Sequence, residues 1–156
     1  MEKSSNKDFH ELLLKAERFC AYQERCSSEL KQKLRELGAD EEESAKIISS
    51  LQEDDYLNDE RFAQLFTSGK FRIKRWGKNK IRGELKRKNI SDKFISAAFD
   101  LIDKAEYLKV IEHLAKKKER EVKGKSPSDK KQKIGMFLLS RGFESELIWK
   151  CINLKI

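Results

Sequence analysis

Apolar positions recur along the chain with the three- and four-residue spacing that predicts amphipathic helices. Three such stretches align without gaps, at residues 30–48, 81–99 and 134–152. Each begins with an apolar residue that is followed four positions later by a leucine; the pairs are Leu30 and Leu34, Ile81 and Leu85, and Ile134 and Leu138. A repeat of about 50 residues is typical of helical arrays. The pattern therefore predicts three copies of one helical unit.

Each aligned stretch contains a break between two helices. Eight positions after the first anchor stand Gly38, Asn89 and Gly142, residue types that tolerate the left-handed backbone at a helix end. Residues suited to cap the next helix follow: Asp40 in a capping box with Glu43, Ser91, and Glu144 or Ser145. Each unit thus has at least two helices joined by a tight turn.

A further helix precedes each aligned stretch. The clearest one starts after Asn58, a good N-cap, and its apolar face is predicted to hold Phe62, Leu65, Phe66, Ile73 and Trp76. The distance from the aromatic residue of this helix to the next anchor grows from 11 to 19 to 27 residues along the chain, for Phe19, Phe62 and Tyr107. We therefore expect the first helices of the second and third units to project, and residues 124–129 to form an exposed loop.

The fold class that follows is all-α, with three tandem three-helix repeats in an elongated, curved array. The expected boundaries are residues 9–57, 58–103 and 104–156. The chain has 156 residues and one proline, and its Lys, Glu, Leu, Arg and Ala content favours helix. One such unit buries too little apolar area to be stable alone, so neighbouring units should stack, as they do in repeat proteins.

Charge is strongly segregated along the sequence. The net charge is +8, yet residues 36–60 hold ten acidic residues and one basic residue. Residues 70–93 hold eleven basic and two acidic residues, and residues 116–133 hold nine basic and three acidic residues. Solvated helix faces explain a mixed pattern better than a segregated one. The pattern favours a binding surface for a polyanion or for an acidic groove of a protein.

The candidate partner- or nucleic-acid-binding residues lie in these basic segments. They are Arg72, Lys74, Arg75, Trp76, Lys78, Lys80, Arg82, Lys86, Arg87, Lys116, Lys117 and Lys118. Lys78, Arg82 and Lys86 are four residues apart and should form one helical stripe beside the buried Ile81 and Leu85. Lysine and arginine suit contacts to phosphates and carry no base specificity. Trp76 either stacks on a base, contacts a partner or, as we favour, closes the elbow at Gly77 from the core.

The sequence offers little for catalysis or metal binding. Its two histidines, His10 and His113, lack partners at metal-ligand spacing, and the three cysteines predict buried thiols in a reducing cytoplasm. The acidic runs at 40–44 and 53–60 resemble helix first turns and a solvated turn. We therefore expect no enzyme, no metal and no cofactor. The polar first residues do not resemble a signal peptide and no apolar run reaches the length of a membrane span, so we expect a cytoplasmic protein.

Several segments, in this order, resemble the signature of the RecX family of bacterial recombination regulators. They are "LKQKLRELG", "YLNDERFAQLF", "RWGKNKIRGELKRKNIS" and "FLLSRGFESELIWKCI", and together they cover about Phe9 to Ile152. Asn89 stands where the family usually has glycine, and both residues suit a helix end. The resemblance implies a monomeric interaction protein in recombination, DNA repair and the SOS response. Its implied partner is the RecA recombinase filament on single-stranded DNA.

The resemblance also implies what such binding does. RecX-like proteins lie along the groove of the RecA filament, hinder its extension and dampen strand exchange, ATP hydrolysis and coprotease activity. Two other functions stay open from the residues alone. One is sequence-independent binding to DNA or RNA without RecA, which includes direct contact with single-stranded DNA. The other is a metal-dependent nuclease, which the lack of histidine ligands disfavours.

Overall fold

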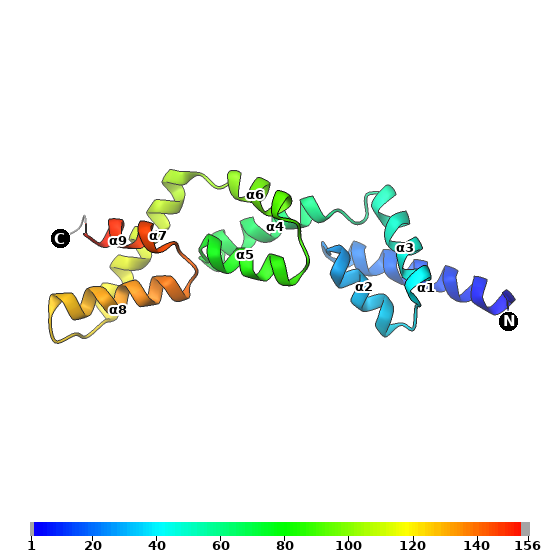
Figure 1. Ribbon diagram of the computed structural model, residues 1–156, viewed down its shortest axis with the longest axis horizontal. Coiled ribbons are helices and arrows are strands. Elements are labelled where there is room, and N and C mark those ends of the chain that lie inside the picture. Colours follow the sequence, from blue (N-terminus) through cyan, green and yellow to red (C-terminus); the bar gives the residue numbers. More distant parts are fainter. Residues whose placement is uncertain (1, 154–156) are drawn as a thin grey trace.

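The computed structural model describes the backbone of residues 2–153 and the side chains of residues 8–153. This part of the chain forms helices and contains no strand, which confirms the all-α prediction. The helices are α1 (Glu2–Tyr22), α2 (Ser27–Glu36), α3 (Glu41–Glu53), α4 (Asp59–Arg72), α5 (Lys78–Arg87), α6 (Asp92–Asp100), α7 (Lys104–Glu121), α8 (Pro127–Ser140) and α9 (Ser145–Asn153). They are arranged as three groups of three in one elongated row, with the termini at opposite ends (Figure 1).

The turns between the second and third helices of the repeats have the predicted backbone. The φ angles of Gly38, Asn89 and Gly142 are 90°, 60° and 96°, all in the left-handed region. The caps also form as expected in the first two repeats, where the Asp40 carboxylate accepts from the Glu43 amide and the Ser91 hydroxyl accepts from the Phe94 amide. The sequence signals at these three turns therefore set where the helices end.

The growing distance from aromatic residue to anchor, on which the expected projection of the first helices rested, does not come from longer helices. The first helices α1, α4 and α7 have 21, 14 and 18 residues, so the middle one is the shortest. The error has a simple cause, because the three aromatic residues are not equivalent in space. Phe19 lies near the end of α1, whereas Phe62 and Tyr107 lie near the starts of α4 and α7. The rising distance between aromatic residue and anchor therefore reflects where the aromatic residue lies in its helix, and not how long the helix is.

The apolar face predicted for α4 is only partly correct. Phe62 is buried and Phe66 packs against the same core, but the side chains of Leu65 and Ile73 are 55% and 79% exposed. The buried face runs instead through Phe62, Ala63, Thr67 and Phe71. Leu65 lies on the opposite face of α4 from these buried residues. The helix ends at Arg72, so the helical spacing no longer determines the direction of the Ile73 side chain.

The exposed loop of the third repeat is shorter and begins earlier than expected. Residues 122–126 connect α7 to α8, and the Ser126 hydroxyl accepts a hydrogen bond from the Asp129 amide as the cap of α8. Pro127 is the first residue of α8, where its missing N–H costs nothing. Residues 127–129 therefore belong to a helix. The end of α7 and the start of α8 form a hairpin that projects from the row (Figure 1).

Among residues 8–153 the buried apolar side chains form two clusters. The first fills repeat one and includes Leu30, Leu34, Ile47, Leu51 and Leu57. The second is continuous through repeats two and three, and its members range from Phe62 to Ile152. Stacking was expected between all neighbouring repeats. The clusters show a shared core only between repeats two and three. Cys26 is the single repeat-one residue of the described chain that belongs to this second cluster.

The junction between repeats two and three is closely packed. The rings of Phe71, Tyr107 and Phe143 form a chain with centroids 5.6 and 5.5 Å apart. Gly77 donates its N–H to the Arg141 carbonyl at 2.8 Å, and a Cβ on Gly77 would lie 2.4 Å from the Gly142 backbone. Glycine is required at the Trp-Gly elbow because another repeat's backbone touches it.

The Tyr107 hydroxyl joins the same two repeats through hydrogen bonds. It accepts from the first N–H of α5, on Lys78, at 3.0 Å and donates to the Glu144 carboxylate. Burial and the bond to Glu144 raise the pKa of Tyr107, so the phenol stays protonated. Glu144 precedes α9 and was expected, with Ser145, as a candidate cap. Glu144 does occupy the N-cap position, since its carbonyl accepts from the Ile148 N–H at 3.0 Å and Ser145 is the first helical residue, while its carboxylate accepts from the Tyr107 hydroxyl.

The junction between repeats one and two is mostly polar. The Asp59 carboxylate accepts from the Ser27 amide at 2.7 Å. Arg61 pairs with Glu24 at 2.9 Å, and Lys88 pairs with Glu29 at 3.1 Å. Burial works against ionisation of Glu29, but hydrogen bonds from the Cys26 N–H and from Lys88 outweigh it and lower the pKa of Glu29 below 4.5. This ion-paired contact holds the first repeat to the other two.

Replacing Glu29 with glutamine should weaken this junction in a pH-dependent way. At pH 7 we expect the free energy of unfolding to fall by about 1 kcal/mol, the upper range for partly exposed ion pairs. Because the pKa of Glu29 is lower in the folded protein, its stabilisation is present above 4.5 and is lost as pH falls through the folded value. Urea denaturation of both proteins from pH 7 to pH 3 should show the difference shrinking.

Glu11→Gln is the matched control, because Glu11 is exposed on α1 and forms no ion pair within residues 8–153. Its unfolding free energy should follow the wild type at every pH. A constant difference between Glu29→Gln and the wild type down to pH 3 would contradict the proposed role of the carboxylate charge.

Candidate partner-binding surface

The candidate surface consists of the end of α4, the elbow at residues 73–77 and helix α5. We call it the α4–α5 surface. Arg75 in the elbow has a left-handed backbone, with φ of 59°, which is unusual for a residue with a long side chain. The Trp76 N–H closes the elbow on the Lys70 carbonyl at 3.1 Å, and Gly77 fixes it to repeat three. The elbow is therefore held from both sides.

Trp76 is half-buried and packs against the second apolar cluster. The Nζ atoms of Lys70 and Lys80 lie over its ring, 4.8 and 4.5 Å from the centroid. Lys70 also lies 5.3 Å from the centroid of Phe66. The Trp76 ring thus packs on the core and carries two ammonium groups on its face. This favours the interpretation of Trp76 as a core residue at the elbow. Lys70 was missed as a candidate, because sequence spacing alone does not reveal its contact with Trp76.

Two cations of α5 rest on aromatic rings of other helices. Lys78 Nζ is 4.9 Å from the ring centroid of Tyr107, and the Arg82 guanidinium is 5.1 Å from that of Phe99. Arg82 also donates to the Asn79 side chain at 3.0 Å. Cation–π contacts hold a charge in place while leaving its hydrogen-bond donors free. These side chains are therefore partly ordered before any partner arrives.

The remaining cations of the surface differ in whether an acid already neutralises them. Lys86 pairs with Asp92 at 3.4 Å, and Arg87 pairs with Glu84 at 2.9 Å. Arg72, Lys74 and Arg75 are exposed and form no ion pair with any residue of the 8–153 segment. The cations at the end of α4 and in the elbow are therefore not neutralised within the described chain, whereas Lys86 and Arg87 near the end of α5 are.

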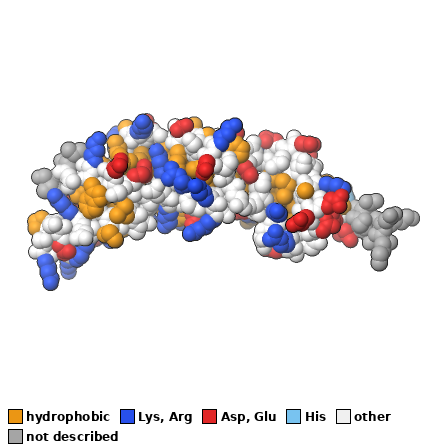
Figure 2. Space-filling view, in the orientation of Figure 1, with side chains coloured by type: hydrophobic (Ala, Val, Ile, Leu, Met, Phe, Trp, Pro, Cys, Tyr) orange, Lys and Arg blue, Asp and Glu red, His pale blue; other side chains and the backbone are white. Residues whose placement is uncertain are grey.

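The other predicted cations lie elsewhere. Lys116, Lys117 and Lys118 are in the second half of α7, on the projecting hairpin and not on the α4–α5 surface (Figure 1). Lys118 lies 4.6 Å from the Phe137 ring centroid and 3.9 Å from Glu121, whereas Lys116 and Lys117 are exposed. On the face shown in Figure 2, basic side chains gather over the middle of the row and acidic ones toward repeat one.

The described residues contain no group of three or more His, Cys, Asp or Glu side chains placed to hold a metal ion. Asp55, one of the acids considered for a nuclease, pairs with Arg61 at 3.1 Å. Cys20, Cys26 and Cys151 are buried, and burial raises the pKa of the Cys20 thiol to about 11. In residues 2–153 every helix is too short or too polar to traverse a bilayer.

Three family models match the chain in consecutive segments. They describe the first, second and third three-helix domains of RecX, and they match residues 13–51, 58–98 and 105–152. These ranges fall on the three groups of helices. The match therefore extends over most of the chain and follows its repeat order.

Similar curated proteins carry the name regulatory protein RecX. The one from Chlorobaculum tepidum is 36% identical over 127 residues, which are 81% of this chain and 77% of that protein. The one from Clostridium perfringens strain 13 is 35% identical over 128 residues, and the one from Bacillus cytotoxicus is 27% identical over 148 residues. The chain covers only 57% and 55% of these two longer relatives.

Two crystal structures have the same fold. One is of RecX from Lactobacillus salivarius, with a TM-score of 0.88 and 26% identity over 96% of this chain and 97% of that one. The other, of a regulatory protein RecX, also has a TM-score of 0.88, with 21% identity over 96% of this chain and 75% of that one. Similarity at this level confirms the tandem arrangement of three-helix repeats.

Proposed function

Because this chain belongs to the RecX family, we propose that it binds the RecA filament on single-stranded DNA and inhibits its activities. These activities are strand exchange, ATP hydrolysis and coprotease function. The observation that carries the proposal is the α4–α5 surface, whose cations are held on aromatic rings in the middle of an elongated row. Such a shape suits the groove of a filament.

The geometry suggests how binding occurs. The unpaired Arg72, Lys74 and Arg75 approach the phosphates or acidic side chains of the groove first, because no acid of the described chain neutralises them. Lys78 and Arg82 then add contacts from a more rigid helix. Ordering side chains before binding lowers the entropy cost of association. Repeats two and three share one core, so they engage the groove as one body.

The proposal is tested by titrating the protein into RecA bound to single-stranded DNA. We expect ATP hydrolysis and strand exchange to fall at amounts of protein below or near one per RecA subunit, with no cleavage of the DNA. Electron microscopy should also show shorter filaments when RecA assembles in the presence of this protein. Unchanged ATP hydrolysis at a molar excess of the protein would contradict the proposal.

A second candidate function is sequence-independent nucleic-acid binding without RecA. The lysine and arginine composition of the α4–α5 surface favours it, since these residues contact phosphates in any sequence. Binding to single-stranded DNA alone, measured by fluorescence anisotropy, separates the two functions. Under the first proposal, affinity for the RecA filament exceeds affinity for bare DNA. Equal affinities would favour the second.

A further inference from the structure

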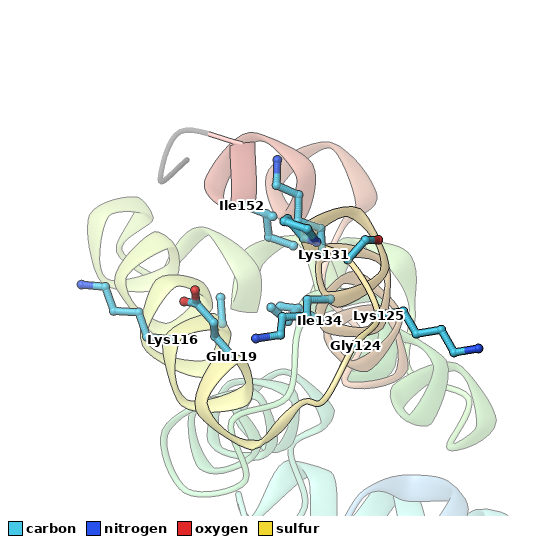
Figure 3. A pocket seen from close by; sticks show the side chains of 11 residues that line it. Lys116, Glu119, Gly124, Lys125, Lys131, Ile134 and Ile152 are labelled. Atoms are coloured by element: carbon cyan, nitrogen blue, oxygen red, sulfur yellow. The ribbon is translucent and has the colours of Figure 1, made fainter.

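A cavity of about 470 Å³ lies in the third repeat, between the two arms of the α7–α8 hairpin (Figure 3). Its volume is within the roughly 300–1,000 Å³ of typical ligand sites. Ala115, Ile134 and Ile152 line it and are at most 6% exposed, so its floor is apolar. Ile134 and Ile152 face its middle in Figure 3. The cavity is separate from the α4–α5 surface.

The wall formed by the α7–α8 loop is held in place by specific contacts. Lys133 Nζ donates to the Lys123 carbonyl at 2.8 Å, and the Lys125 N–H donates to the Asp129 carboxylate at 3.2 Å. A Cβ on Gly124 would lie 2.7 Å from the Lys130 side chain, so glycine lets the loop approach α8 closely. These contacts keep the loop beside the start of α8.

The rim of the cavity is strongly positive. Lys116, Lys125, Lys130 and Lys131 contribute to its lining, and none forms an ion pair with any residue of segment 8–153. Glu119 is the one acidic residue of the lining. In Figure 3 the side chains of Lys116, Lys125 and Lys131 extend away from the apolar floor. Positive charge therefore surrounds an apolar centre.

We propose that this cavity binds an acidic polypeptide segment that inserts an apolar side chain. The apolar floor gains free energy only from an apolar group, at about 25 cal/mol per Å² removed from water. The four lysines favour carboxylates placed beside that group. A sugar-phosphate backbone satisfies the lysines but leaves the floor empty, so a polypeptide matches the whole site better than nucleic acid does.

The site gives the protein a second docking point on the opposite side of the repeat-two core from repeat one. This proposal does not rest on the proposed function, because it is argued from the chemistry of the cavity lining and not from binding to the RecA filament. Two anchors on one rigid body raise the overall affinity through effective concentration. The sequence alone did not reveal it, because its lining comes from three helices and a loop.

The test uses short fluorescent peptides and the full-length protein. One peptide has two central leucines flanked by aspartate and glutamate, a second has serines in place of the leucines, and the third probe is an oligo-dT strand. We expect the leucine peptide to bind saturably and the serine peptide to bind at least about tenfold more weakly. Equal binding of both peptides, or no saturable binding, would overturn the proposal.

Two triple variants with the same charge change locate the binding. Lys116→Gln, Lys130→Gln and Lys131→Gln alter the rim, whereas Lys104→Gln, Lys109→Gln and Lys150→Gln alter exposed positions of α7 and α9 outside the lining. The rim variant should raise the dissociation constant of the leucine peptide about tenfold, and the control should leave it unchanged. Equal losses in both variants, or a rim effect confined to oligo-dT, would overturn the proposal.

Discussion

Gly77→Ala should lower the free energy of unfolding by about 3 kcal/mol, the upper range for overpacking a rigid site. The alanine Cβ would lie 2.4 Å from the carbonyl carbon and oxygen of Gly142 and from the Phe143 nitrogen. These are backbone atoms of another repeat, so no side chain can move aside. The junction must open, which also breaks the hydrogen bond from Gly77 to Arg141. Urea denaturation measures the loss.

Gly83→Ala, six residues farther along the chain in α5, provides the matched control. A Cβ on Gly83 meets no atom within 4 Å, and the residue lies in the interior of α5. Alanine there should stabilise the protein by about 0.5–1 kcal/mol, because it restricts the unfolded chain and favours helix. If Gly77→Ala has the stability of the wild type, the close contact of the two turns does not hold repeats two and three together.

Reversing Arg72, Arg75, Lys78 and Arg82 to glutamate should weaken binding to the RecA filament by at least about 100-fold at low salt. Each phosphate contact on a single strand contributes about 0.7 to the log–log slope of affinity against salt, so losing four contacts flattens the slope by about 3. The fold should persist, since Ile81 and Leu85 form the buried stripe of α5 and remain unchanged. Fluorescence anisotropy over a range of salt concentrations measures both quantities.

An equal charge change in repeat one is the control for this reversal. Lys15, Arg18, Lys31 and Arg35 are exposed and lie outside the basic segments. At about 0.15 M salt, where exposed charges more than about 8 Å apart are largely screened, their replacement by glutamate should alter filament affinity by less than about threefold. Similar losses in both variants would show that net charge, and not the α4–α5 surface, determines binding.

Local features of the fold were predictable from the sequence because they depend on neighbouring residues. The spacing of Ile81 and Leu85 sets a buried stripe, and Asn89 marks the end of its helix. Contacts between distant segments were not predictable in this way. Leu65 has helical spacing from Phe62 yet is exposed, because the direction of the core depends on where α5 and α6 lie.

The candidate surface shows the same limit. A basic segment with Trp76 at its centre was evident from composition, and the structure places most of its residues on one elbow and one helix. The rings that support the cations were not predictable, because Phe99 and Tyr107 come from α6 and α7. Which of these cations bind a partner stays a prediction. Lys116, Lys117 and Lys118 belong with the cavity of the third repeat or flank it.

The contrast between the two junctions determines where the molecule is mechanically soft. Interlocked rings and touching glycines tolerate almost no rotation, because any tilt separates atoms that are in van der Waals contact. Ion pairs such as Glu24 with Arg61 stay attractive over a wider range of distances and angles. We therefore expect thermal bending to concentrate between repeats one and two, with repeats two and three moving as one stiff body and repeat one as a compliant arm.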